Sequence, residues 1–161
     1  MKKGLLLVLS TAAVSGVSIF LNKYSVSVIN PYIFTFLKNA MVALIFCAII
    51  LSVKNRKTIA RLTKKQWLIL LLIGFMGGGL AFLLFFKGLS LTSAAQGAFI
   101  HKTMFIYIAI LAALFLKEKI NKEFILGAAL LMLGTFFSMK TLPVSFGRGD
   151  LLVLAAAFLW A

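Results

Sequence analysis

AAQGAFIHKTMFIYIAILAALFL, residues 94–116, is a continuous apolar stretch with one histidine and one lysine inside it. A helix needs about 20 mainly apolar residues to cross a hydrocarbon core of about 30 Å, and this stretch is long enough. Its apolar residues follow one another without the alternation of a half-buried strand. In lipid, only a helix or a closed barrel satisfies the backbone polar groups. The stretch therefore predicts a membrane-spanning helix.

Comparable apolar runs lie on both sides of this stretch. In chain order, the predicted spans cover residues 4–22, 31–53, 67–86, 94–116 and 124 to about 142. A sixth run begins at Asp150 and is too short to cross a bilayer as a helix before the last residue given. The sequence predicts an all-α, polytopic membrane helix bundle of five transmembrane helices plus a truncated sixth.

The composition agrees with a bilayer as the solvent. Of the 161 residues 63% are hydrophobic, whereas an ordinary soluble domain has about 45 to 50%. The 17 Lys and Arg outnumber three Asp and Glu and give a net charge of +14, which in a soluble protein would suggest nucleic acid. Here the basic residues lie mostly between the apolar runs, as in cytoplasmic loops that contact anionic headgroups. We expect the lipid bilayer as a partner and no nucleic acid.

The basic residues also predict an orientation. Residues 54–65 contain six Lys and Arg, and the positive-inside rule assigns such a loop to the cytoplasm. Alternation then places the N-terminus and residues 117–123 inside as well. The other side receives four basic residues that fall outside the predicted spans: Lys23, Lys87, Lys140 and Arg148. We expect a multi-pass protein of the cytoplasmic membrane.

Five complete spans predict a repeat of inverted topology. An odd number of crossings leaves the next segment on the opposite side, so a second copy of the unit would be inverted, a design found in many secondary transporters. Residues 1–142 would then form a five-helix repeat, and residues 150–161 would be the truncated first helix of a second repeat. The chain is expected to be an N-terminal fragment whose C-terminal repeat is missing.

Residues for hydrolytic or metal chemistry are scarce. The sequence has no HExxH, GxSxG, phosphate-binding loop or pair of carboxylates. His101 is the only histidine and Cys47 the only cysteine. The acids Glu118, Glu123 and Asp150 lie at the ends of predicted spans. We therefore expect no enzyme, no metal site and no cofactor.

Two lysines inside predicted spans are the candidate binding residues. A lysine near the membrane centre costs about 2.5 to 3.5 kcal/mol on insertion scales and usually faces the bundle interior or water. At 1.5 Å per residue, Lys102 lies roughly 12 Å and Lys38 roughly 10 Å along spans that both start outside. Either they line a polar cavity and attract an anionic or carboxylate-bearing solute, or they snorkel to the headgroups. An ion pair with the missing half is a third possibility.

Polar neighbours of these lysines complete the candidate site. Asn39 and His101 are adjacent to them in sequence, and Gln96 lies on the same span as Lys102. His101 could relay a proton, although a single histidine is more often a packing residue. Tyr107 lies deep in its span, where it could line the cavity or pack in the core. Trp160 lies near a predicted span end, where interfacial aromatic residues are expected.

Four glycines mark the third predicted span: Gly74, Gly77, Gly78 and Gly79. Small residues four apart allow helix backbones to approach closely. Consecutive glycines also weaken a helix, so the segment could instead bend or unwind, line a cavity or move during transport. Helix packing and a hinge are both open readings.

The order of features from residue 74 to residue 137 resembles a known family. A glycine-bearing span is followed by a short turn of small residues at 92–95, a span that ends in Glu118, and a span that contains Gly127 and Gly134. This order resembles the third to fifth spans of an EamA-type transporter of the drug/metabolite transporter superfamily. Members of that family have two five-span repeats, with a Glu at the position of Glu118.

The second span adds a match, and two positions depart from the family. Leu37 and Lys38 match the family's Leu-Arg pair after Pro31, with Lys in place of Arg. The family usually has a proline near Met104, and this chain has none. Where the family has a glycine before the glutamate, this chain has Lys117. The departures near His101 and Lys102 put substrates inherited from the family in doubt.

The resemblance implies a secondary transporter, most often an exporter, that moves a small organic solute or metabolite across the cytoplasmic membrane by alternating access. Two other classes remain open. One is a lipid-carrier flippase on a similar scaffold, and the other is a non-transporting membrane scaffold.

Overall fold

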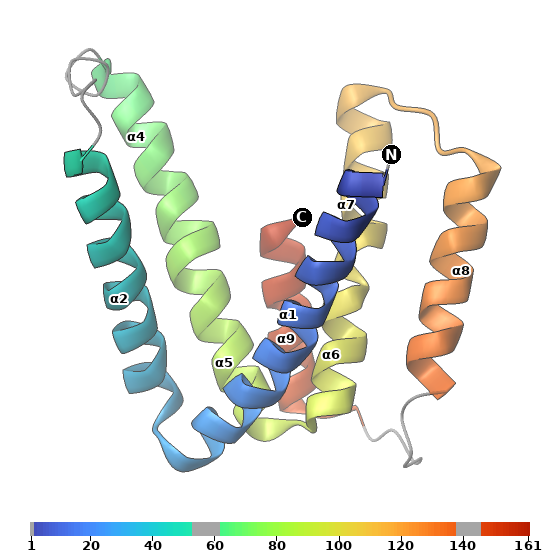
Figure 1. Cartoon of the computed structure of the whole chain (residues 1–161), viewed down its shortest axis with the longest axis horizontal. Helices are drawn as coiled ribbons and strands as arrows, with labels where there is room; N and C mark the ends of the chain where they lie inside the picture. The colour runs from blue at the N-terminus through green and yellow to red at the C-terminus, as the bar shows by residue number, and fades with distance from the viewer. Residues whose placement is uncertain (1, 53–61, 138–145) are drawn as a thin grey trace.

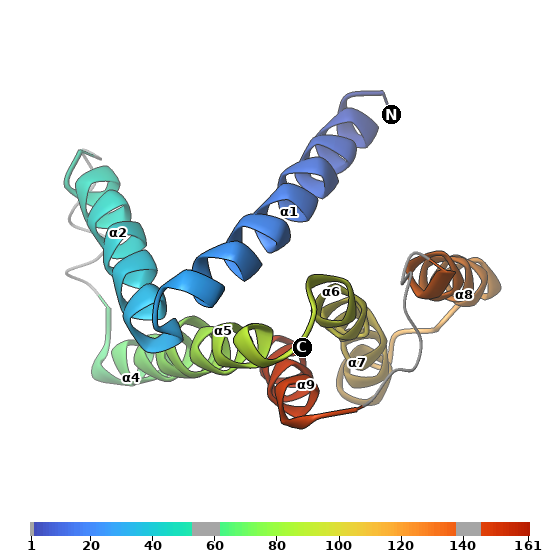
Figure 2. The same cartoon turned by 90° about the horizontal axis from the view of Figure 1, so that it is seen from below.

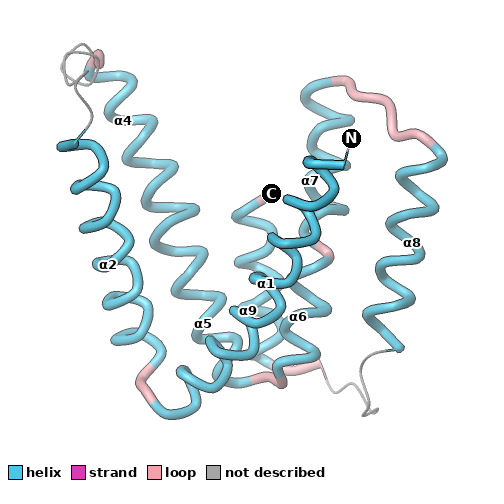
Figure 3. Tube along the Cα trace, viewed as in Figure 1, coloured by secondary structure: helices cyan, strands magenta, loops and turns pink. Residues whose placement is uncertain are grey.

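The computed structural model describes residues 2–52, 62–137 and 146–161, and within these ranges the chain forms helices and short connections without strands (Figures 1 and 3). In chain order the helices are α1 (Lys2–Val28), α2 (Pro31–Ser52), α4 (Lys64–Ile73), η1 (Gly74–Leu80), α5 (Ala81–Leu91), α6 (Ala94–Lys102), α7 (Met104–Leu111), η2 (Ala112–Leu116), α8 (Lys122–Phe137) and α9 (Arg148–Trp160). The segments η1 and η2 are π-helical.

Among the described residues, four helical stretches are long and apolar enough to cross a membrane: Lys3–Val28, Pro31–Ser52, Lys64–Leu91 and Ala94–Leu116. The chain is thus an all-α, multi-pass membrane protein, as its apolar runs predicted. The fifth predicted span corresponds to α8, which has 16 described residues; its predicted continuation to about residue 142 lies outside the described residues. The sixth run forms α9, which has 13 residues.

Two helices extend beyond their predicted ends and include lysines that contact other helices. Lys23 and Lys87, expected in outer loops, lie inside α1 and α5. The Lys23 ammonium donates to the carbonyl oxygen of Leu89 at 2.9 Å and of Ser90 at 3.5 Å. The Lys87 ammonium lies 5.5 Å from the ring centroid of Tyr32. A charge in the sequence therefore does not mark the end of these helices.

The described helices meet most closely around α9. α9 lies beside α5 and α6 in both views, and it contacts α7 and η1 as well (Figures 1 and 2). α1 touches α2, α5 and α6 and runs away from the other helices toward its N-terminus, whereas α8 lies at the edge and contacts α6 (Figure 2). The short α9 thus packs against α5 and α6 on one face and leaves Leu151 and Phe158 exposed on the other.

The α5–α9 contact is close because it is built from small residues. A Cβ added to Gly88 would lie 2.6 Å from the carbonyl oxygen of Gly149, and one added to Gly149 would lie 2.9 Å from that of Gly88. No side chain fits between these two backbones. Phe86, Leu89 and Val153 flank the contact with no exposed surface, and they form the core of the described residues together with Val26, Phe85, Ile100 and Ala156.

Asp150 holds the start of α9 in place. Its carboxylate accepts a hydrogen bond from the Thr92 hydroxyl at 2.6 Å and another from the backbone N–H of Gly147 at 2.7 Å. The second bond satisfies one of the free N–H groups at the helix start. The carboxylate is 2% exposed. This acid therefore joins α9 to the turn between α5 and α6.

The glycine-rich part of the third span widens into a π-helix instead of unwinding. The backbone N–H of Ala81 donates to the carbonyl oxygen of Met76, five residues earlier. Gly77, Gly78 and Gly79 have no side chains that would crowd this winding, and glycine gives little support to an α-helix. The helical stretch from α4 to α5 is thereby continuous across η1.

Candidate functional site

One pocket collects the two lysines and the histidine that the sequence marked. It has a volume of about 260 Å³ and lies among α1, α2, α5, α6 and α9. Three side chains carry or can carry positive charge, namely Lys38, Lys102 and His101. The remaining lining residues are Val14, Ser15, Ser18, Ile19, Asn22, Phe82, Phe85, Phe86 and Trp160. No acid is among the described residues that line it.

Lys38 projects from α2 toward the interior of the bundle. Its ammonium donates to Asn22 Oδ1 on α1 at 3.0 Å. The same nitrogen lies 4.8 Å from the ring centroid of Phe86 and 5.8 Å from that of Phe34, close enough for a cation–π attraction. An amide oxygen and two rings thus fix this half-buried cation at the pocket, and no carboxylate neutralises it there.

Lys102 and His101 reach the pocket from the end of α6. The Lys102 side chain is exposed and borders a second pocket, between α1 and α6, as well. The His101 ring packs between Phe85 and Trp160, at centroid distances of 5.2 Å and 5.3 Å. Its Nδ1 is buried, and none of the described residues provides it with a hydrogen-bond partner. His101 therefore belongs to the wall, whereas Lys102 is the more accessible cation.

Trp160 has a different position from the interfacial one that the sequence predicted. Trp160, in the last turn of α9, is partly buried and packs against the core of the described helices. The indole contacts the rings of Phe82, Phe85 and His101 at centroid distances of 5.0 to 5.5 Å. Its Nε1 donates to the carbonyl oxygen of Gly77 at 2.8 Å. Trp160 is a wall of the pocket, and the interfacial prediction is wrong for this residue.

Three other predicted residues lie outside this pocket. Asn39 faces away from Lys38 and donates through Nδ2 to the carbonyl oxygen of Gly78 at 2.8 Å. Gln96 lies in the first turn of α6, where its backbone N–H donates to the Ser93 hydroxyl at 3.1 Å. Tyr107 lies on α7 with its ring edge against Phe158, at a centroid distance of 6.0 Å.

The π-helical glycines are linked to the pocket through their carbonyl groups. Gly77 accepts from Trp160 and Gly78 accepts from Asn39, the residue that follows Lys38. Nothing lies within 4 Å of a Cβ built on Gly74, Gly77 or Gly78. A Cβ built on Gly79 would lie 3.9 Å from the carbonyl oxygen of Gly74, five residues earlier. Among the described residues, these four glycines therefore have no atom of another helix within 4 Å of an added Cβ, and the contacts of Gly77 and Gly78 with other helices run through their carbonyl oxygens.

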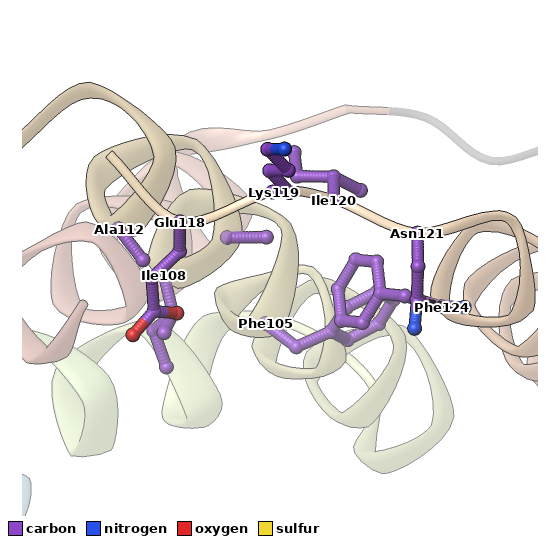
Figure 4. A pocket seen from close by; sticks show the side chains of 9 residues that line it. Phe105, Ile108, Ala112, Glu118, Lys119, Ile120, Asn121 and Phe124 are labelled. Atoms are coloured by element: carbon purple, nitrogen blue, oxygen red, sulfur yellow. Dashed lines mark hydrogen bonds between the residues drawn. The ribbon is translucent and has the colours of Figure 1, made fainter. Parts of the chain in front are cut away.

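Glu118 lies at a second pocket, at the far end of the fourth span. This pocket has a volume of about 290 Å³, and its lining combines apolar residues of α7 and η2 with the turn that leads to α8 (Figure 4). The turn begins at Lys117, whose φ of 56° lies in the left-handed region. That region favours glycine, the residue that the family resemblance led us to expect at this position. Glu118 and the two lysines therefore line different pockets.

Sequence reasoning did not single out the face of α1 that lines the first pocket. Ser15, Ser18 and Asn22 lie three and four residues apart, which places them on one side of a helix. This polar stripe in an apolar run was the signal that could have identified them. Asn22 also donates to the Ser18 hydroxyl at 3.3 Å.

The geometry brings two lysine side chains from different helices to one pocket. Two ammonium groups at one pocket without a carboxylate produce a positive potential in a low-dielectric setting. The pocket lining contains no paired acid and base. Among the residues that the structure describes, no three His, Cys, Asp or Glu side chains gather as a metal site would require.

An all-α bundle with charged side chains around an internal pocket is the architecture of a membrane transporter. The model of the EamA-like transporter family matches residues 2–140, and the chain belongs to that family.

Three curated relatives carry transporter names. The chain is 31% identical over 123 residues to an "Uncharacterized transporter" of Methanothermobacter thermautotrophicus, a match that covers 70% of this chain and 35% of the relative. It is 29% identical over 126 residues to the "Uncharacterized transporter in cobO 3'region" of Sinorhizobium sp, a match that covers 78% of this chain and 89% of the relative. It is 27% identical over 165 aligned positions to the "Uncharacterized transporter YyaM" of Bacillus subtilis, a match that covers 97% of this chain and 52% of the relative.

The matched part of the archaeal relative is thus about a third of its length, and that of the Bacillus relative about half. No solved structure matches the chain.

Proposed function

We propose that the chain is part of a secondary transporter that exports a small organic anion across the cytoplasmic membrane by alternating access. Residues 1–142 supply a five-helix repeat, and residues 150–161 begin a second repeat. The Bacillus relative, of which the chain covers 52%, is consistent with two such units. Membership of the EamA-like transporter family supports transport as the activity.

The pocket with Lys38 and Lys102 is the observation that carries this proposal. Its two ammonium groups come from α2 and α6, and α9 closes one side. A solute bound there touches helices of both proposed repeats, so movement of one repeat against the other would change which side of the membrane the pocket faces. The charge of the pocket selects an anion because like charges repel a cation.

Transport by vesicles that contain the protein tests the proposal. The substitutions Lys38→Met and Lys102→Met keep most of the side-chain length and remove the charge. Each should reduce transport of an organic anion about tenfold or more, because a charge-assisted contact is lost, while abundance in the membrane stays the same. Lys87→Met is the matched control, since its ammonium lies over Tyr32 outside the pocket.

Two results would contradict the proposal. Unchanged anion transport in both pocket variants would show that the two lysines do not line the path of the solute. Movement of a labelled lipid between leaflets, without movement of any soluble anion, would instead favour a flippase.

A further inference from the structure

The residues that line the pocket around Lys38 and Lys102 indicate which class of anion the pocket binds. This inference rests on the proposed function. Its cations differ in accessibility. Lys38 is half-buried and uses one donor on Asn22 Oδ1 at 3.0 Å, whereas Lys102 is exposed. An ammonium has three donors, so Lys38 retains donors for a ligand after that bond. One anionic group can therefore be held at the Lys38 side.

The described polar atoms at the pocket are neutral acceptors, which pair with a ligand's own ammonium group less strongly than a carboxylate does. Asn22 Oδ1 accepts from Lys38, and the Ser18 hydroxyl accepts from Asn22 Nδ2 at 3.3 Å. Among the described lining residues no carboxylate is present. A ligand that carries both a carboxylate and an ammonium would bring its positive charge beside two lysines without an acid to pair with. Such a zwitterion is disfavoured relative to a simple carboxylate.

The other side of the pocket is aromatic. Phe82, Phe85 and Trp160 contact one another edge-on or at a tilt, at centroid distances of 5.0 Å for Phe82–Trp160 and 5.5 Å for Phe85–Trp160. These rings offer apolar surface that a carboxylate alone would leave uncovered. At about 30 Å³ for each water molecule in the liquid, the pocket holds roughly nine waters. A single ring with one carboxylate is of comparable bulk.

We infer that the pocket selects a small organic acid, with one carboxylate and a compact apolar body, over an amino acid that carries the same ring. The carboxylate is held by Lys38 and attracted by Lys102, and the apolar body lies against Phe82, Phe85 and Trp160. Selection against the amino acid follows because two lysines repel its ammonium group and no carboxylate is among the described lining residues.

Binding of four ring compounds to the purified chain tests the inference: benzoate, benzamide, phenylalanine and benzylamine. Benzoate should bind, and phenylalanine should bind about tenfold or more weakly. Benzamide has the same ring without the charge and should bind at least as weakly as phenylalanine, and benzylamine should show no binding. Lys38→Met should weaken benzoate binding about tenfold or more, and Lys87→Met should leave it unchanged.

The outcomes separate this inference from the proposed function. Absence of benzoate binding, or phenylalanine binding that equals benzoate binding, overturns the selection of an organic acid. Transport of another anion that still depends on Lys38 would then leave the proposed function in place. Conversely, benzoate that binds in a Lys38-dependent way but is not moved across vesicles by the protein sustains the inference and contradicts transport of this class.

Discussion

The indole Nε1 of Trp160 donates a hydrogen bond of 2.8 Å to the carbonyl oxygen of Gly77. This bond connects a wall of the pocket on α9 to the π-helical segment η1 of the third span. Asn39 makes a similar bond to Gly78 at 2.8 Å. A ligand that shifts the Lys38 region or Trp160 therefore acts on the carbonyl groups of two adjacent glycines.

Trp160→Phe should loosen η1, because it keeps a ring in the pocket wall but removes the donor to Gly77. We expect a loss of about 1 kcal/mol in stability and faster amide hydrogen exchange across residues 74–80, measured by mass spectrometry in detergent. Trp67→Phe is the control, since Trp67 on α4 is 46% exposed. Equal exchange in the two variants would show that the indole bond does not restrain η1.

Asn22→Asp should lower the positive charge of the pocket. The substituted carboxylate would lie at the position of Asn22 Oδ1, 3.0 Å from the Lys38 ammonium, and would pair with it. Benzoate affinity should fall about tenfold or more, with the thermal midpoint unchanged or raised. Asn30→Asp makes the same change at the α1–α2 turn, where Asn30 accepts from the backbone N–H of Tyr32, and should not alter binding. Unchanged affinity in Asn22→Asp would mean that Lys38 does not hold the carboxylate.

Gly88→Ala should separate α5 from α9. The new methyl group would lie 2.6 Å from the carbonyl oxygen of Gly149, so the backbones must move apart at a cost of about 1–3 kcal/mol. Thermal unfolding in detergent measures the change. Gly127→Ala on α8 provides the opposite case: nothing lies within 4 Å of its added Cβ, and alanine should stabilise the helix by up to about 1 kcal/mol. A Gly88→Ala variant as stable as the unmodified chain would contradict this docking of α9.

Lys117→Gly should stabilise the turn after η2. Lys117 has a φ of 56°, a conformation that costs a residue with a Cβ about 1–2 kcal/mol. Glycine avoids this cost, but it loses more conformational entropy on folding, which offsets part of the gain. We expect a net gain of a few tenths of a kcal/mol to about 1 kcal/mol in thermal unfolding. Lys119→Gly removes an equal charge from the same turn at ordinary φ, and it should give no gain. A larger benefit at Lys119 would show that charge, rather than backbone conformation, limits the turn.

The apolar runs predicted the helices well because lipid leaves the backbone few alternatives. Residues 94–116 are helical over the length that their sequence suggested. The ends of α1 and α5 were less predictable. From sequence alone, Lys23 and Lys87 resemble loop residues, and their contacts with Leu89, Ser90 and Tyr32 on other helices cannot be read from a single apolar run.

The candidate site was partly predictable for a similar reason. The cost of a lysine at membrane depth drew attention to Lys38 and Lys102, and these two residues line one pocket. The role of Trp160 depends on a contact with Gly77, 83 residues away in the chain. Sequence periodicity describes the face of a single helix, so it could have revealed the polar stripe through Asn22 but not the neighbour that this stripe meets.

The crossing of Gly88 and Gly149 limits how relatives of this chain can vary. A clash between two side chains can be relieved by a smaller partner, so such positions change in pairs during evolution. Here the atoms that an added methyl group would meet include backbone atoms on both sides, and no substitution removes a backbone. Every relative that docks α9 on α5 in this way should keep glycine at both positions, without compensating pairs.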